Sequence, residues 1–172
     1  SRDRFAKLVF VSNYQLATYN LALGVPYANA IVLRNAIDPI EYKEKDKDVV
    51  RIIYHTTPHR GLNLVVAAVK AIAEEMGDKI HLDVYSSFEA YGWKERDKPY
   101  EDLFEEIRQH PNMTYHGFQS NDVVRKALQE AHIFAYPSVW PETSCISAIE
   151  AMSAGCEVVC PNFAALPETT GN

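Results

Sequence analysis

The sequence predicts an α/β fold, a Rossmann-like parallel sheet with helices on both of its faces. Strand-length apolar runs alternate with helix-length stretches along the chain, and this order is typical of parallel strands joined by helices that cover the sheet. A length of 172 residues with 47% hydrophobic residues allows one buried core and leaves too little chain for two ordinary domains. Residues 1–172 are therefore expected to form a single domain.

The first part of the chain is predicted to form a strand, a helix and a second strand. Residues 8–11 and 30–33 are short apolar runs, and the capping-box pattern Ser12-x-x-Gln15 should begin a helix that ends near Gly24. A turn at 35–39 and the charged stretch 41–48 follow, and we expect the charged stretch to be a solvated loop.

From residue 49 onward the order of strand and helix repeats. The expected strands are 49–54, 80–85, 113–115, 133–136 and 156–160. The expected helices are 60–76, closed by Gly77, then 100–110, then 121–131, opened by Ser120, and finally 144–154. The stretch 86–99 is long and irregular, which indicates either a functional loop or an idle insertion.

Composition argues against several classes of partner. The formal net charge of -6 would repel nucleic acids and anionic membrane surfaces. No apolar run approaches the roughly 20 residues that span a bilayer, so we expect no transmembrane segment. The three cysteines form no Cys-x-x-Cys pair, which favours a reducing, cytoplasmic location and leaves peripheral membrane association of a parent protein open. The chain stops soon after an apolar run, and we expect it to be a piece of a longer protein.

The strand-to-helix loops 55–61, 116–120 and 137–144 contain the candidate ligand contacts. Parallel sheets bind ligands beyond the carboxyl ends of their strands, where helix N-termini offer free amide groups. Glu142 lies just before the start of a predicted helix, and Glu150 follows eight residues later, roughly 12 Å away if the segment between them is helical. A carboxylate accepts paired hydrogen bonds, which suits the vicinal hydroxyls of a ribose or a hexose.

In these segments the sequence resembles family 4 glycosyltransferases, which are retaining enzymes of the two-lobed GT-B fold. The resemblance is carried by Tyr136-Pro137-Ser138, by Glu142-x7-Glu150 and by Ala151-Met152-Ser153-Ala154-Gly155. It extends through residues 35–38, 60–62 and 113–118 to Ala131-His132, so it covers nearly the whole chain. The resemblance implies that residues 1–172 are the donor-binding lobe, without the N-terminal acceptor domain and without the extreme C-terminus.

The resemblance also implies roles for the residues of the 142–150 segment. Glu150 is expected to bind the ribose hydroxyls, and Glu142 is expected to bind the transferred sugar. The amide groups of Ser144 and Cys145 would hold the distal phosphate, and the neighbouring amide of Thr143 is available to the same oxygens.

Arg60 would face the diphosphate, where its planar fork can bind two oxygens and neutralise the leaving group. Arg60 and Glu142 are therefore the expected catalytic residues. Gly117 lies in the loop that would contact the base. Enzymes of this family generally need no metal, so neither a metal ion nor a cofactor is expected.

The sequence departs from the family pattern in several places. The basic residue that usually stands a few positions before Arg60 is absent, and His55 and His59 are the candidates to replace it. Other replacements are Ser144-Cys145 for a Phe-Gly pair, Ala36 for the Gly of an Asn-Gly turn, and Ala164-Ala165 for a Gly-Gly pair.

Other motifs have simpler interpretations. The spacing of His55 and His59 could suit a metal if the segment were helical, but Pro58 favours a loop, and Asp46-Lys47-Asp48 lies in a charge run. Trp93 and Trp140 could stack on a base or a sugar, although local packing is the simpler reading. The thiols of Cys145, Cys156 and Cys160 are interpreted as packing groups.

The sequence thus predicts a donor lobe that binds a nucleoside diphosphate sugar for retaining transfer of a hexose-type sugar. A saccharide, lipid or protein acceptor would be bound by the missing lobe, so the isolated chain should transfer weakly or not at all. The alternatives are a non-catalytic nucleotide or phosphate-sugar binding module and a sugar epimerase of the same two-lobe architecture. No Gly-x-Gly-x-x-Gly follows the first strand, which disfavours a dinucleotide enzyme.

Overall fold

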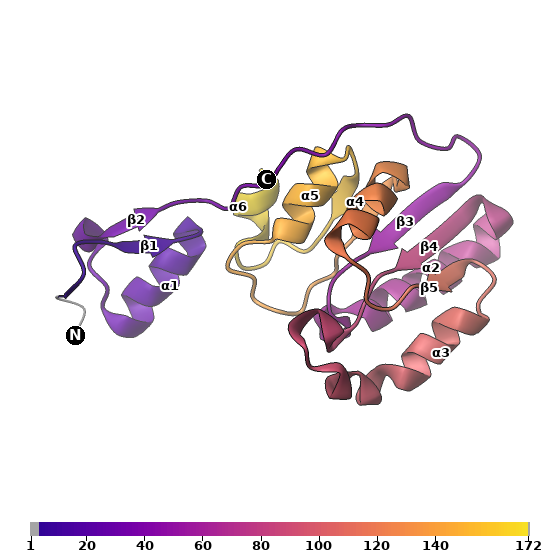
Figure 1. Ribbon diagram of the computed structural model, residues 1–172, viewed down its shortest axis with the longest axis horizontal. Helices are drawn as coiled ribbons and strands as arrows, with labels where there is room; N and C mark the ends of the chain where they lie inside the picture. The colour runs from indigo at the N-terminus through magenta and orange to yellow at the C-terminus, as the bar shows by residue number, and fades with distance from the viewer. Residues whose placement is uncertain (1–3, 172) are drawn as a thin grey trace.

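The structure is a computed structural model that describes residues 4–171 (Figure 1). A parallel five-stranded sheet has the order β5-β4-β3-β6-β7. Its strands are β3 (Val50–Tyr54), β4 (Ile80–Val84), β5 (Met113–Tyr115), β6 (Ile133–Ala135) and β7 (Glu157–Val159). The connecting helices are α2 (Leu62–Met76), α3 (Glu101–Gln109), α4 (Asn121–Glu130) and α5 (Ile146–Ser153), and α6 (Leu166–Thr170) closes the chain.

Helices cover both faces of this sheet, and in Figure 1 α4 and α5 lie on one side with α3 on the other. The central strands are largely buried, as Tyr54, Leu82 and Phe134 illustrate with 0% exposure each, whereas the edge strand β7 is exposed at Glu157 and Val159. Right-handed crossovers account for the two helical layers, because the chain moves outward from β3 to β5 and then in the opposite direction from β6 to β7. The predicted Rossmann-like lobe is confirmed.

The first strands do not join this sheet. The elements β1 (Leu8–Phe10), α1 (Asn13–Leu23) and β2 (Ala30–Val32) form a two-stranded parallel sheet with its own small core of Phe10, Leu16 and Val25. We call residues 8–33 the N-terminal unit, and Figure 1 shows it apart from the main sheet. The predicted strands 8–11 and 30–33 thus lie outside the five-stranded sheet, and residues 33–49, which form no helix or strand, connect the unit to it.

The predicted charged loop 41–48 is irregular, but it is not simply solvated. The ammonium group of Lys45 donates hydrogen bonds to the carbonyl oxygens of Leu128 (3.3 Å), Ala154 (3.1 Å) and Ala131, where α4 and α5 end. A cation at helix C-termini satisfies carbonyls that lack partners and complements the helix dipole. The buried Ile40 also fixes this segment, and we call residues 38–49 the strap.

Three further expectations differ from the structure. Helix α5 begins at Ile146 instead of 144, because Cys145 is extended and serves as its N-cap residue. The stretch 86–99 contains two 3-10 segments, which fold around the buried carboxylate of Asp97, an acceptor for the Ser87 hydroxyl and the Phe88 amide. Helix α6 was not predicted from the sequence. Within residues 4–171, no helix has both the length and the apolar character needed to cross a bilayer.

Candidate functional site

The sheet order places β3 beside β6, and the chain leaves this pair in opposite directions. The carboxyl ends of such a pair form a topological switch point, where open α/β sheets bind their ligands. The loop 55–61 follows β3, and the loop 136–145 follows β6. These two loops bring Arg60 and Glu142 together, although 82 residues separate them in the sequence.

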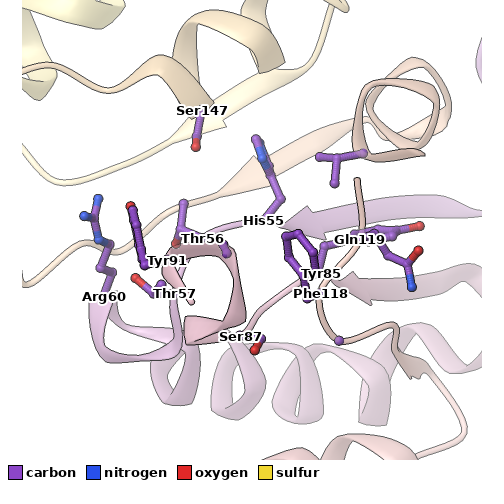
Figure 2. A pocket seen from close by; sticks show the side chains of 13 residues that line it. His55, Thr56, Thr57, Arg60, Tyr85, Ser87, Tyr91, Phe118, Gln119 and Ser147 are labelled. Carbon is purple, nitrogen blue, oxygen red and sulfur yellow. The ribbon is translucent and has the colours of Figure 1, made fainter. Parts of the chain in front are cut away.

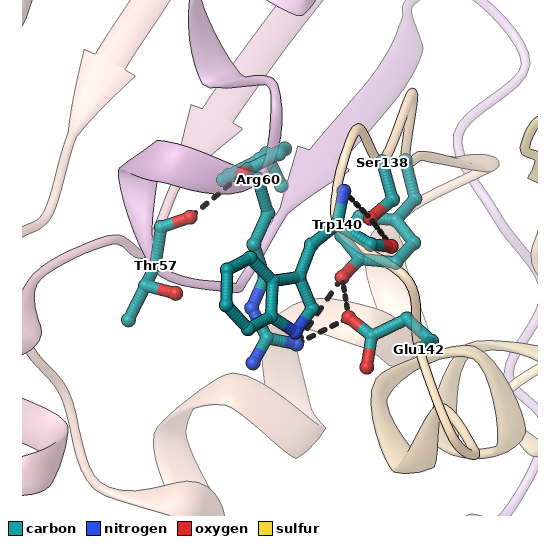
Figure 3. A network of polar contacts seen from close by, with 7 residues as sticks. Thr57, Arg60, Ser138, Trp140 and Glu142 are labelled. Carbon is teal, nitrogen blue, oxygen red and sulfur yellow. Dashed lines mark hydrogen bonds and ion pairs between the residues drawn. The ribbon is translucent and has the colours of Figure 1, made fainter. Parts of the chain in front are cut away.

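The guanidinium group of Arg60 forms an ion pair with the carboxylate of Glu142 (Figure 3). The hydroxyl of Tyr136 donates to the same carboxylate oxygen and accepts from Arg60 at 3.3 Å. Burial lowers the pKa of Arg60, but the hydrogen bond to Tyr136 and the charge of Glu142 outweigh it, so the net pKa is raised. Burial and the bond to Glu142 raise the pKa of Tyr136. The cluster therefore holds a charged Arg60 against a carboxylate and a neutral phenol, and both of these contacts use Nη1 of the guanidinium.

A cavity of about 160 Å³ adjoins Arg60 at this edge of the sheet (Figure 2). Figure 2 shows Thr56, Thr57, Tyr91 and Arg60 toward one end and Phe118 and Gln119 toward the other. The residues that line it are His55, Thr56, Thr57, Arg60, Tyr85, Ser87, Ala90, Tyr91, Gly117, Phe118, Gln119, Val124 and Ser147.

Several buried polar atoms of this cavity have no hydrogen-bond partner among residues 4–171. They are Nε2 of His55, the hydroxyls of Thr56 and Thr57, and Nε of Arg60, and Nδ1 of His59 on the same loop shares this property. Buried polar groups are nearly always hydrogen-bonded in proteins, so a concentration of unpaired ones on one loop indicates a place for polar ligand atoms. Neither threonine was among the site residues predicted from the sequence.

Neither histidine supplies a second positive charge at neutral pH. Burial lowers the pKa of His55 to about 4, and its ring packs on Phe134 with 4.7 Å between the ring centres. Burial and the nearby Arg60 lower the pKa of His59, which stacks on Phe88 at 5.2 Å and meets the edge of Trp140 at 5.3 Å. Arg60 is therefore the one permanent cation among the residues that line the cavity.

The buried, neutral His55 makes stability depend on pH. In the unfolded chain its imidazole binds a proton below pH 6.5, whereas in the folded protein it does so only near pH 4. The unfolded state binds more protons in this window, so stability falls as the pH drops from 6.5 toward 4, by on the order of 3 kcal/mol. Urea unfolding at pH 7 and pH 5 should show a smaller loss for His55→Gln than for the unchanged protein. An equal loss in both would contradict the assignment.

Glu150 is buried on α5, where one of its oxygens, Oε1, accepts hydrogen bonds from Arg125 and from Asn121, both at 3.2 Å. Arg125 also donates to the carbonyls of Asp38 (2.7 Å) and Pro39 (3.1 Å) in the strap. The other carboxylate oxygen of Glu150, Oε2, takes part in neither of the hydrogen bonds from Arg125 and Asn121. The carboxylate is thus held between α4 and α5, and Glu150 is not among the residues that line the cavity.

The remaining predicted residues take different positions. Gly117 lines the cavity with a φ of 65°, whereas Thr143 is exposed and Ser144 is half-buried. Cys145 is buried, and burial raises the pKa of its thiol to about 12, which fits a packing role. Because α5 begins at Ile146, the hydroxyl residue of its first turn that lines the cavity is Ser147.

The alternative metal motifs do not form a site. Within residues 4–171 no three His, Cys, Asp or Glu side chains gather closely enough to hold a metal ion. The carboxylate of Asp46 accepts hydrogen bonds from the amides of Asp48 (2.8 Å) and Val49 (3.3 Å), which is a local turn. The ring of Trp140 meets the ring of His59 edge to face. The guanidinium carbon of Arg96 lies 4.3 Å from the centre of the Trp93 ring.

The fold and the switch-point cavity define an α/β lobe with a candidate ligand site, and comparisons with known proteins identify its family. The family model described as glycosyl transferases group 1 matches residues 34–172, so the chain belongs to this family. The match begins where the N-terminal unit ends. A comparison with curated proteins found no match.

Several solved structures share the fold. A glycosyltransferase from Rickettsia africae is 15% identical with a TM-score of 0.76, over 96% of this chain and 47% of that one. HepE from Anabaena, solved in complex with UDP-glucose, is 15% identical with a TM-score of 0.72, over 95% of this chain and 46% of that one. Sucrose-phosphate synthase from Thermosynechococcus elongatus is 17% identical with a TM-score of 0.72, over 96% and 43% of the two chains. The chain therefore spans less than half the length of each of these structurally similar proteins.

Proposed function

We propose that this chain is the donor-binding part of a retaining, family 4 type glycosyltransferase that takes a hexose-type sugar from a nucleoside diphosphate sugar. The observation that carries the proposal is the meeting of Arg60 and Glu142 at the switch point, beside a cavity with unpaired buried polar atoms. A cation for the diphosphate and a carboxylate for sugar hydroxyls are the two groups that such a donor requires.

In this proposal the cavity holds the phosphates. Arg60 neutralises the charge that develops on the leaving diphosphate, and the hydroxyls of Thr56 and Thr57 donate to its oxygens. The proposal also assigns to this anion the amide groups at the start of α5, where Cys145 makes no side-chain cap and Ser147 lines the cavity. These neutral donors supply hydrogen bonds where a second cation is absent, but they add no positive charge. The reaction proposed here needs no metal ion, because leaving-group stabilisation comes from protein groups.

The proposal assigns Glu142 to the transferred sugar, Oε2 of Glu150 to the ribose, and the loop around Gly117 to the base. HepE was solved with UDP-glucose, so a uridine nucleotide is the first donor to test. A saccharide, lipid or protein acceptor is proposed to bind a part of the protein outside this chain. The three free cysteines agree with the cytoplasmic location proposed for the reaction.

Calorimetric titration of the chain with UDP, GDP, ADP and their common sugar conjugates tests the proposal. One nucleotide class should bind, and Arg60→Ala and Glu150→Ala should each weaken it by about 1–3 kcal/mol, as loss of a charged hydrogen bond does. Arg108→Ala is the matched control, since Arg108 lies on the surface of α3 and pairs with Glu105. A nucleotide that binds equally well to both variants would show that the site is elsewhere.

A non-catalytic binding module is the second candidate, and the neutral state of His55 favours it because charge compensation of a leaving diphosphate is then incomplete. Sugar transfer by a longer form of the protein that includes an acceptor domain separates the two candidates. Binding without any transfer to saccharide, lipid or protein acceptors would favour the module.

A further inference from the structure

The N-terminus of α1 is completed by a residue from the other end of the chain. Ser12 caps the helix by accepting from the amide of Gln15 at 3.0 Å, and the helix has no acidic residue in its first turn. The amides of Asn13 and Tyr14 instead donate to the two carboxylate oxygens of Glu168, at 3.0 and 3.1 Å. A helix leaves its first amide groups without partners, and the positive end of its dipole attracts an anion.

Two further contacts strengthen the hold of Glu168 on the N-terminal unit. The side-chain amide of Asn13 donates to Oε1 at 2.8 Å, and the guanidinium of Arg34 lies 3.2 Å from the same oxygen. Burial raises the pKa of Glu168, but the amide hydrogen bonds from Asn13 and Tyr14 outweigh it, so the net pKa is lowered. The carboxylate is therefore charged at neutral pH, and Glu168 is half-buried where α6 meets the unit.

Glu168 is also connected to the candidate site through α6. Leu166 and Ala165, at the start of this helix, are fully buried in the main domain. The amide of Ala165 donates to the carbonyl oxygen of Glu142 at 3.1 Å. The preceding Ala164 has a φ of 55°, so the chain turns sharply between β7 and α6. A continuous series of hydrogen bonds thus runs from α1 through α6 to the backbone of Glu142.

We propose that Glu168 is a positioning residue that fixes the orientation of the N-terminal unit relative to the loop that carries Glu142. The carboxylate acts through the amide groups of α1, and Glu168 is not among the residues that line the cavity. Since the unit and the main domain have separate cores, a local anchor of this kind decides whether they tumble as one body. The inference does not depend on the proposed function, because it concerns orientation and not nucleotide binding.

Residual dipolar couplings of the 172-residue chain measure this orientation directly. In the unchanged protein, the N-terminal unit and the main domain should share one alignment tensor. Glu168→Ala should reduce the couplings of the unit relative to those of the main domain, and Glu168→Gln, which keeps an acceptor but loses the charge, should restore part of them. Amide exchange at Asn13 and Tyr14 should rise about tenfold in Glu168→Ala, in line with the loss of a helix cap.

Asn13→Asp separates anchoring from simple capping. The new carboxylate favours the N-terminus of α1 by itself but repels Glu168, so α1 should stay folded while the unit loses its fixed orientation. Glu95→Gln, an exposed change on the main domain, should behave like the unchanged protein. A shared tensor that survives in both Glu168→Ala and Asn13→Asp, or two independent tensors in the unchanged protein, would overturn the inference.

Discussion

Glu142→Gln is expected to tighten the binding of a nucleoside diphosphate about tenfold, equivalent to about 1.4 kcal/mol. In the structure the carboxylate of Glu142 pairs with Nη1 of Arg60, so a diphosphate competes with it for that part of the guanidinium and meets its negative charge. Glutamine removes the competing charge and its repulsion of phosphate, while its carbonyl can still accept from Tyr136. Glu142→Gln is therefore expected to raise the affinity for the nucleoside diphosphate.

The same substitution should help a nucleoside diphosphate sugar less, because the sugar loses a charged acceptor for its hydroxyls. Calorimetry with the nucleotide and with its sugar conjugate measures both effects. Arg60→Lys should weaken the binding of both ligands, since an ammonium group cannot form the paired hydrogen bonds of a planar guanidinium. Glu157→Gln, an exposed change on β7, is the matched control. Equal weakening of nucleotide and nucleotide sugar by Glu142→Gln would contradict the competition between Glu142 and phosphate.

Gly61→Ala is expected to destabilise the protein by about 2–5 kcal/mol or to prevent folding. Gly61 has a φ of 109°, and a Cβ atom there would lie 2.5 Å from the carbonyl oxygen of Pro137. Both the strain and the clash involve backbone, so no side-chain rotation relieves them. The close approach holds the loop after β3 against the loop after β6, and it is this contact that places Arg60 beside Tyr136.

Urea unfolding of Gly61→Ala beside Gly92→Ala measures the effect. Gly92 has a φ of 73°, and no atom lies within 4 Å of the place that an added methyl group would take. Its substitution should therefore cost about 1 kcal/mol from strain alone. Equal losses of stability in the two variants would show that the Pro137 contact contributes nothing.

Local patterns predicted the regular elements of the main domain well. The alternation of strand and helix, the cap at Ser12 and the glycine at the end of α2 all follow from interactions between residues close in sequence. The start of α5 was misplaced because Cys145, its N-cap residue, offers no capping side chain, and the nearby Ser144 fits the N-cap pattern better. Only the extended backbone at Cys145 shows where the helix begins.

The features that sequence reasoning missed depend on long-range contacts. The separation of the N-terminal unit follows from strand pairing that no local pattern encodes, and the anchoring of Lys45 requires the ends of two distant helices. The residue types of Arg60 and Glu142 indicated ligand binding, but not that the two side chains pair with each other. Thr57 lies before Pro58 and after a buried strand, and this position is the one local signal that could have selected it.

The strap limits how far the N-terminal unit can travel if Glu168 releases it. Leu33 is still bonded to the unit through the carbonyl of Phe10, and the strap is held to the main domain from Asp38 onward. The roughly five peptide steps between these two residues reach at most about 18 Å. An acceptor-binding part joined to the unit would therefore stay at a high effective concentration near the donor cavity, even in a protein whose two lobes are free to rotate.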